Sequence, residues 1–352
     1  MNVIRWGIIG CGDVCEVKSG PAFQKASGSA LVAVMRRDGA KAADFAKRHR
    51  VARWYDDADR LINDREVDAV YIATPPGDHE EYSLRVAAAG KPCYVEKPMA
   101  RSYAECCRMN QAFAAAGKPL FVAYYRRRLP RFIRAKELID SGQLGVVTGC
   151  HYRLTRYFWP KPPDQWRLSA KQSGGGIFLD LGSHTLDVLD NLLGPFTEFG
   201  GSAHGTGATD VEDTVALHFQ TERGVVGTAS WNFAGSAADD LIEIIGTEGR
   251  LCFSTFGTEP LRLYREEQGE EDSMTAQTFE DPIPQHVHQP LVQTMVDELL
   301  GRGVCPSTGA SAARTAKVMD AALKNYYGSR DDAFWERPDT WPGRAMPVGK
   351  NI

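Results

Sequence analysis

Residues 3–15 read Val-Ile-Arg-Trp-Gly-Ile-Ile-Gly-Cys-Gly-Asp-Val-Cys. The apolar run over 3–9 predicts a buried strand, and the glycines that follow it predict a turn into a helix. The first two glycines of a G-x-G-x-x-G pattern at such a junction are typical of a loop that binds a dinucleotide pyrophosphate. The candidate contacts in this loop are Gly10, Cys11, Gly12, Asp13 and Val14.

Cys15 stands where this pattern usually has its third glycine. That position requires close packing of the helix against the strand, and another small residue also meets the requirement. Pairs of glycines close ordinary turns as well, so the loop alone leaves a plain turn open as the alternative.

Strand and helix patterns alternate through the first part of the chain. Short apolar runs of the kind that form buried parallel strands occur at 3–9, 31–34, 69–73, 92–95 and 120–123. Helical patterns lie between them at 40–48, 58–63, 79–89 and 102–116. Right-handed crossovers then give a doubly wound parallel sheet, with ligand sites at the carboxyl ends of the strands. We predict an α/β chain whose Rossmann domain covers residues 1–124.

The pattern changes after a helix predicted over 131–141. Longer alternating segments predict strands at 146–156, 197–203, 214–219, 225–231, 240–245 and 250–254. Helices are predicted at 183–193, 287–300 and 310–326, the last capped by Ser307 or Thr308. We therefore expect a second α/β domain over 125–330 with an open, mostly antiparallel sheet. The Pro-rich tail over 331–352 is predicted to be irregular.

Composition excludes several classes of protein. Of the 352 residues, 43% are hydrophobic and 24% charged, which is enough to build the cores of two domains. The net charge is −4, no apolar run reaches about 18 residues, and the amino terminus is typical of a strand and not of a signal peptide. The eight cysteines lack the Cys/His spacing of a zinc site. We expect a cytoplasmic protein with free thiols and no metal, bound to neither nucleic acid nor membrane.

Cofactor choice depends on the residues that follow the second strand. An acidic residue there accepts hydrogen bonds from the ribose 2′-hydroxyl of NAD, whereas arginines bind the 2′-phosphate of NADP. Here Arg36 and Arg37 occupy the position, so NADP(H) is favoured over NAD(H). The competing interpretation gives Asp38 the NAD-binding role, although Asp38 also suits the N-cap of the next helix.

Three polar residues provide the chemistry of an alcohol dehydrogenase. Oxidation of a secondary alcohol needs a base on the hydroxyl, and the pKa range of histidine makes His184 the better candidate. Lys97 then stabilises the developing alkoxide. Asp180 precedes His184 by one helical turn, so it either orients the imidazole or holds a second substrate hydroxyl. Taken singly, each of these residues also fits an ordinary surface or capping position.

The chain resembles the Gfo/Idh/MocA family, named after glucose-fructose oxidoreductase and inositol dehydrogenase. The resemblance spans essentially the whole sequence and rests on the order of four motifs: Gly10-Cys11-Gly12, Ala73-Thr74-Pro75-Pro76 with His79, Glu96-Lys97-Pro98, and Gly174-Gly175-Gly176 leading to Asp180, His184 and Asp187. It implies a Rossmann domain followed by an open-sheet α/β domain, and NAD(P)-dependent oxidation or reduction of sugars and related polyols.

The resemblance also implies roles for further residues. It puts Thr74, Pro75, His79, Glu96, Lys97, Trp166 and Arg167 near the cofactor, and Lys97, Tyr125, Arg126, Asp180 and His184 near the substrate. Helix capping by His79 and loop packing by Trp159, Trp166 and Arg167 are the plainer alternatives. Tyr125-Arg126-Arg127-Arg128 departs from the family's common Asn-Arg-Arg-Phe, which leaves the substrate open; the basic run is either a solvated segment or part of the cleft.

Three functions remain open at this point. The first is an NADP(H)-dependent oxidoreductase that transfers a hydride to or from a sugar, polyol or cyclic diol. The second is a glycosidase or lyase that uses tightly bound NAD transiently, and the third is a non-catalytic nucleotide-binding regulator. Retention of Lys97, Asp180 and His184 together argues against the third. We expect a carbohydrate-like substrate and a homodimer or homotetramer formed through the open sheet.

Overall fold

The structure of the chain is a computed structural model. The structure describes residues 3–158, 164–266 and 274–344. Trp159 of the predicted cleft loop lies outside the described residues, as do residues 345–352 of the tail.

The chain divides into two compact units. The first runs to Leu129 and also includes Ile283–Ala316, whereas the second comprises Pro130–Pro282 and the residues from Lys317 onward. The sequence assigned all of 125–330 to a second domain, so the return of Ile283–Ala316 to the first unit is a feature that local patterns did not reveal.

The first unit is built on a six-stranded parallel sheet in the order β3-β2-β1-β4-β5-β6. Trp6 and Ile8 of β1 pack in one hydrophobic core, while a side chain at Gly7 would meet Leu61 on the opposite face. Because both faces are covered, the strands are continuous apolar runs. β3 was not predicted, since its Arg-Trp-Tyr sequence carries no such run. The strands are β1 (Ile4–Ile9), β2 (Ser29–Met35), β3 (Arg53–Tyr55), β4 (Ala69–Ile72), β5 (Cys93–Val95) and β6 (Leu120–Val122).

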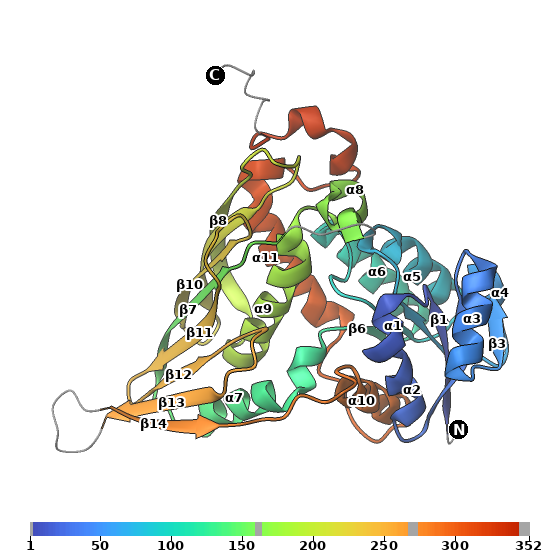
Figure 1. Cartoon of the computed structure of the whole chain (residues 1–352), viewed down its shortest axis with the longest axis horizontal. Coiled ribbons are helices and arrows are strands. Elements are labelled where there is room, and N and C mark those ends of the chain that lie inside the picture. Colours follow the sequence, from blue (N-terminus) through green and yellow to red (C-terminus); the bar gives the residue numbers. More distant parts are fainter. Residues whose placement is uncertain (1–2, 159–163, 267–273, 345–352) are drawn as a thin grey trace. The chain divides into compact units, whose positions relative to one another are not determined.

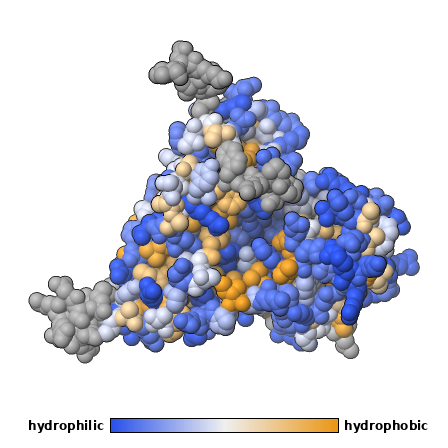
Figure 2. Space-filling view, in the orientation of Figure 1, coloured by the Kyte–Doolittle hydropathy of each residue, from blue (hydrophilic) through white to orange (hydrophobic). Residues whose placement is uncertain are grey.

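Helices connect these strands and are capped locally. Asp38 caps α3, because its carboxylate accepts from the backbone N–H of Lys41. The exposed sides of α3 and α4 belong to a mainly hydrophilic surface (Figure 2). The helices and 3₁₀ turns of this unit are α1 (Asp13–Val17), α2 (Gly20–Lys25), α3 (Gly39–His49), α4 (Ala58–Ile62), η1 (Pro76–Asp78), α5 (His79–Ala88), α6 (Tyr103–Ala116), η2 (Tyr125–Arg128) and α10 (Gln289–Leu299).

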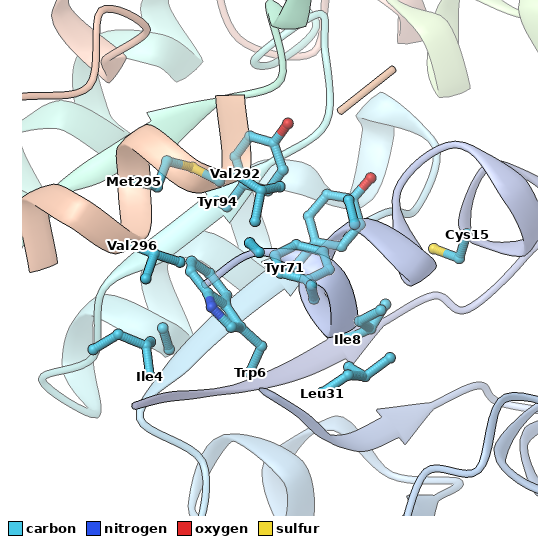
Figure 3. Packing of buried hydrophobic residues seen from close by; sticks show 14 of the residues in the cluster. Ile4, Trp6, Ile8, Cys15, Leu31, Tyr71, Tyr94, Val292, Met295 and Val296 are labelled. Carbon is cyan, nitrogen blue, oxygen red and sulfur yellow. The ribbon is translucent and has the colours of Figure 1, made fainter. Parts of the chain in front are cut away.

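Helix α10 completes the core of the first unit from far along the chain. Its buried side chains Val292, Met295 and Val296 point toward Trp6 and Tyr94 (Figure 3). An amphipathic helix does not encode which apolar surface it covers. This is why the sequence predicted the helix correctly but not the unit in which it packs.

The second unit contains an eight-stranded sheet in the order β14-β13-β12-β11-β7-β10-β9-β8. Its pairs are antiparallel except β7 with β10, so the predicted mostly antiparallel sheet is confirmed. Three helices, α7 (Pro130–Asp140), α9 (Ile177–Leu193) and α11 (Gly309–Tyr327), lie along one face of the sheet (Figure 1). The strands are β7 (Val147–Thr155), β8 (Phe196–His204), β9 (Thr214–Thr221), β10 (Val226–Asn232), β11 (Asp239–Gly246), β12 (Arg250–Phe253), β13 (Leu261–Glu266) and β14 (Met274–Phe279).

The remaining helices include α9, which begins at Ile177 and not at the predicted Ser183. The tail after α11 folds back into two 3₁₀ turns, in which Phe334 and Trp341 pack against Tyr327. Among the described residues no helix is both long and apolar enough to cross a membrane. The helices and turns are α7 (Pro130–Asp140), η3 (Asp164–Leu168), α8 (Ala170–Ser173), α9 (Ile177–Leu193), α11 (Gly309–Tyr327), η4 (Phe334–Glu336) and η5 (Pro338–Thr340).

A buried carboxylate caps helix α9. Gly176, the N-cap residue, has no side chain, and its backbone N–H donates to both carboxylate oxygens of Glu212 at 2.9 Å. The Tyr327 hydroxyl also donates to Glu212. Burial raises the pKa of the Glu212 carboxyl to about 7, although these hydrogen bonds favour its charged form.

Met295→Ala should lower the free energy of unfolding by about 2–5 kcal/mol, because it removes a fully buried side chain from the core of the first unit. Denaturant titration measures the change. Val304→Ala, at a position 82% exposed in the same segment, is the control and should change stability by less than about 0.5 kcal/mol. Equal losses in the two variants would contradict the packing of α10 in this core.

Glu212→Gln should alter how stability depends on pH. Between pH 4.5 and about 7 the folded protein holds a proton on Glu212 that the unfolded chain has released. The stability of the wild type relative to Glu212→Gln should therefore fall by about 3 kcal/mol as pH rises through this range, and then stay constant. Denaturant titrations of both proteins from pH 4.5 to 8.5 measure this difference, and a constant difference would show that the carboxyl is not perturbed.

Candidate functional site

The candidate residues of the first unit gather at the carboxyl edge of its sheet. In the parallel register Ile9 pairs with both Met35 and Ile72, and Val95 pairs with both Ile72 and Val122. The residues that follow these strand ends therefore emerge at one edge. They include the glycine loop after β1, Arg36 after β2, Thr74 after β4 and Lys97 after β5. Ligands of open α/β sheets bind at this edge.

The first two glycines of the loop meet different demands. Gly10 has φ 86°, and a Cβ there would lie 2.9 Å from the Thr74 side chain and 3.0 Å from the Ala73 backbone. Gly12 has φ −110°, and a Cβ there would meet nothing closer than the Gly10 carbonyl oxygen at 3.8 Å. The fold itself thus requires Gly10. It leaves open space at Gly12.

The third position of the pattern holds Cys15, and a close approach of a different kind lies further along the chain. Cys15 is fully buried, and helix α1 ends soon after it, at Val17. At Gly20 the start of α2 approaches the backbone of α1, and a Cβ there would lie 2.2 Å from the Cys15 carbonyl oxygen. Gly20 begins α2 and was not singled out from the sequence, because it falls outside the six-residue spacing of the motif.

Arg36 and Arg37 follow β2 as expected. Among the described residues neither guanidinium makes an ion pair or a side-chain hydrogen bond. Arg36 lies close enough to the glycine loop for its charge to oppose the burial that raises the pKa of Cys11 to about 11. Asp38 acts as the N-cap of α3, the role that the sequence offered as its alternative to NAD binding.

His79 ties two loops of this edge together. Its Nε2 lies 2.8 Å from the Thr74 carbonyl oxygen, and its Nδ1 lies 3.0 Å from that of Pro98. Burial lowers the pKa of His79 to about 4, so the ring is neutral and donates from one nitrogen at a time. Thr74 Oγ1, in the same loop, is buried without a hydrogen-bond partner among the described residues. His79 therefore supports the loop, and the Thr74 hydroxyl is left for another group.

Glu96 has its carboxylate inside the unit. It accepts from the Tyr71 hydroxyl and, at 3.1 Å, from the backbone N–H of Lys97. His288 Nε2 lies 3.7 Å away, and His288 Nδ1 is 2.9 Å from the Tyr94 hydroxyl. Burial raises the pKa of Glu96. Burial also lowers that of His288 to about 3, aided by nearby cations that include Lys97. Glu96 thus fixes the backbone of Lys97, and His288 is a supporting residue that sequence reasoning missed.

The basic run after β6 is not a solvated segment. Arg126 and Arg127 are only 9% and 7% exposed, and the Arg127 guanidinium donates to the Pro306 carbonyl oxygen at 3.0 Å. The Arg126 guanidinium lies over the Tyr125 ring, and that ring packs 4.5 Å from His288. Burial of such side chains is typical of a site or of structural support. The plainer interpretation of this run is therefore wrong.

In the second unit, helix α9 carries both Asp180 and His184. The helix already includes Asp180 in its first turn, so the two residues lie one turn apart on a continuous helix. Asp180 Oδ2 accepts from Arg167 Nε at 2.8 Å, and the Arg167 guanidinium stacks 4.3 Å from the Trp166 ring centre. His184 is 3% exposed. The structure thus brings Trp166 and Arg167 to the helix that bears the predicted base.

A loop after β12 contributes residues that the sequence did not indicate. The Phe256 ring meets His184 edge-on at 6.0 Å, and the hydroxyls of Thr255 and Thr185 are 3.3 Å apart. The Asp240 carboxylate accepts from backbone N–H groups of this loop, including that of Phe256. Only the tertiary fold puts a loop from another strand beside α9, so no local pattern could have revealed it. Among the described residues no cluster of three or more His, Cys, Asp or Glu is arranged to hold a metal ion.

Comparison with known proteins agrees with this architecture. A levoglucosan dehydrogenase solved in complex with NADH and L-sorbose superposes with a TM-score of 0.81 at 22% identity, over 91% of this chain and 96% of that one. At this identity the likeness shows the fold alone.

Closer relatives share sequence over nearly the whole chain. A Formosa agariphila protein named Oxidoreductase P35 is 35% identical over 90% of this chain and 97% of its own. Inositol 2-dehydrogenase 2 of Saccharopolyspora erythraea is 31% identical over 92% of each chain. Residues 4–124 match the oxidoreductase family with an NAD-binding Rossmann fold, and residues 132–252 match the GFO/IDH/MocA C-terminal domain. The chain therefore belongs to the Gfo/Idh/MocA family of oxidoreductases.

Proposed function

We propose that this oxidoreductase transfers a hydride between NADP(H) and a secondary alcohol or carbonyl of a sugar, polyol or cyclic diol. The observation that carries the proposal is the convergence of Gly12, Arg36, Thr74 and Lys97 at the carboxyl edge of one parallel sheet. The relative named for inositol supports the choice of a polyhydroxylated substrate.

The residues of the first unit fit a dinucleotide. Gly12 leaves space that a side chain would fill, and Thr74 Oγ1 is a buried donor and acceptor without a partner among the described residues. Both features suit close approach of a polar ligand to the loop. When bound, the nicotinamide would supply the hydride acceptor or donor.

The preference for NADP(H) rests on charge. Arg36 and Arg37 make no ion pair among the residues that the structure describes, and Asp38 is already used as a helix cap. Two guanidinium groups without a carboxylate partner favour a phosphate dianion over a ribose hydroxyl. In this assignment the protein distinguishes NADP(H) from NAD(H) through contacts of Arg36 and Arg37 with the 2′-phosphate.

The catalytic roles follow from the chemistry of alcohol oxidation. We assign His184 as the base that removes the hydroxyl proton, and Lys97 as the cation that stabilises the developing alkoxide. The Glu96 carboxylate accepts a hydrogen bond from the backbone N–H of Lys97 and so fixes the position from which the Lys97 side chain extends. We assign Asp180, whose Oδ2 accepts from Arg167 Nε, to the binding of a second substrate hydroxyl.

The supporting residues complete the assignment. We assign Tyr125 and Arg126 to the substrate side, and Pro75, Glu96, Trp166 and Arg167 to the surroundings of the cofactor. His79 acts through the Thr74 loop, whose carbonyl it contacts at 2.8 Å.

We also propose that the protein forms a homodimer or homotetramer. Size-exclusion chromatography with light scattering measures the mass of the assembly and tests this directly.

The test of function is a turnover screen. Purified protein is mixed with NADP+ or NAD+ and a panel of sugars, polyols and dihydrodiols, and absorbance at the reduced-nicotinamide band is followed. Stoichiometric formation of free reduced cofactor supports the oxidoreductase. Product formation without net cofactor reduction would instead indicate a glycosidase or lyase that uses the nicotinamide transiently.

Gly12→Ala should lower the free energy of unfolding by no more than about 1 kcal/mol, because the added Cβ has space and only the preference of the α1 N-cap for glycine over alanine is lost. It should weaken dinucleotide binding at least tenfold, about 1.4 kcal/mol, if the cofactor fills that space. Calorimetric titration and denaturant unfolding measure the two effects. Gly10→Ala is the matched variant and should lose stability as well, since its φ is positive and its Cβ would collide with the Thr74 loop.

Arg36→Ala with Arg37→Ala should weaken NADP(H) binding by about 1.5–3 kcal/mol per lost charge-assisted contact and change NAD(H) binding little. Fluorescence titration with each reduced cofactor measures both affinities. Asp38→Ala, which removes the adjacent helix cap, is the control for general damage to this loop. Equal loss for the two cofactors would contradict a phosphate site.

Lys97→Met should lower kcat by about two to three orders of magnitude, and His184→Asn should slow oxidation by about 10²–10⁴-fold. The His184 variant should also lose the acid limb of the kcat/KM profile for oxidation, because it lacks the titrating base. Steady-state kinetics between pH 5 and 10 measure both, with cofactor affinity as the control for folding. An unchanged pH profile in His184→Asn would transfer the base role to another residue.

A further inference from the structure

The glycines that precede α9 are held by two buried ionisable residues from elsewhere in the second unit. The Gly176 N–H donates to both oxygens of Glu212 at 2.9 Å, and the Gly174 carbonyl oxygen accepts from Arg330 Nη1 at 2.7 Å. The carboxyl group of Glu212 thus holds the N–H of this short turn, and the guanidinium of Arg330 holds its carbonyl. We call Glu212, Tyr327 and Arg330 the turn clamp.

The clamp accounts for the glycines themselves. A Cβ at Gly176 would lie 2.2 Å from the Glu212 carbonyl oxygen, and one at Gly175 would lie 2.6 Å from the Leu179 side chain and 3.3 Å from the Glu212 carboxylate. Side chains are therefore excluded by the protein's own packing. Gly175 and Gly176 therefore pack against Glu212. Gly12 differs, because the chain leaves open space beside it.

The clamp residues are fixed in turn. The Tyr327 hydroxyl donates to Glu212, and Arg330 Nε donates to Asp320 at 2.7 Å. The Arg330 guanidinium also lies over the rings of Tyr327 and Phe334, at 5.1 and 4.5 Å. These contacts come from α11 and from the tail beyond it, which the sequence predicted to be irregular.

The first turn of α9 carries Asp180, and its setting depends on this turn. The hydroxyl of Ser173, which precedes the glycines, lies within hydrogen-bond distance of three carbonyl oxygens, those of Gly175, Ser169 at 2.9 Å and Arg167 at 3.4 Å, and Arg167 holds Asp180. The turn therefore fixes both the start of the helix and the segment that pairs with its carboxylate. A shift of about 1 Å in such a group is enough to reduce turnover about 100-fold.

We propose that Glu212 and its clamp partners are positioning residues, which hold the start of α9 so that Asp180 meets the substrate in a fixed geometry. This inference rests on the proposed function for the role of Asp180. The contacts of the clamp itself do not depend on it. A merely structural clamp would change the melting temperature and leave the kinetics of the folded protein unaltered.

The experiment compares Glu212→Gln and Tyr327→Phe with wild type in the full-length protein. We expect faster hydrogen exchange over residues 174–180, a rise in KM, a fall in kcat of about 10- to 100-fold in Glu212→Gln, and a smaller fall in Tyr327→Phe. NADP(H) affinity should stay within about twofold, because the proposed contacts with the pyrophosphate and the 2′-phosphate, at the glycine loop and at Arg36 and Arg37, lie in the other unit. Exchange mass spectrometry and steady-state kinetics are the readouts.

Asp213→Asn is the matched control, since this neighbouring carboxylate binds Thr206 and does not contact the glycine turn. Equal kinetic losses in Asp213→Asn would overturn the clamp. Wild-type kinetics in Glu212→Gln would overturn it too, whether or not exchange increases. Failure of the wild type to oxidise any compound of the panel would count against the proposed function instead. In that case, unchanged exchange in Glu212→Gln still overturns the clamp, and faster exchange supports it.

Discussion

The close approach of Gly10 to the end of β4 is the contact around which the candidate cofactor site is built. Its φ of 86° turns the chain out of β1, and a Cβ there would lie within about 3 Å of both Ala73 and Thr74. Because the two strand ends meet, the loop after β1 and the loop after β4 share one edge. His79 then fixes the second loop through the Thr74 carbonyl. The geometry of the edge thus depends on the absence of a side chain at Gly10.

Glycines are used differently in the two units. In the glycine loop, Gly10 is required by the chain, whereas Gly12 leaves space for a group that the chain does not provide. In the turn before α9, the space that side chains at Gly175 and Gly176 would need is already occupied by Glu212 and Leu179. The same residue type therefore marks a ligand surface in one place and internal packing in the other. What a side chain would meet distinguishes the two cases, and a motif in the sequence does not.

Sequence periodicity predicted what is decided locally. Five strands of the first sheet and the amphipathic helices follow from apolar runs and caps, as at Asp38 and Thr308. The candidates Lys97, Asp180 and His184 follow from motif order. Periodicity failed where a partner lies far along the chain: α10 packs on β1, His288 approaches Glu96, and Glu212 caps α9. Such pairings are set by long-range packing, which one sequence without its fold does not display.

Burial sets the charge state of the residues that support the site. His79 and His288 are neutral because desolvation lowers their pKa values to about 4 and 3, whereas Glu212 is raised to about 7. Desolvation disfavours the charged form in each of these cases, so their main contribution is directional hydrogen bonding. Asp180 differs, since its carboxylate is paired with Arg167 and keeps 16% of its side chain exposed. A partly exposed acid that is paired with an arginine is suited to bind a hydroxyl, and the buried groups at the start of its helix are suited to fix its position.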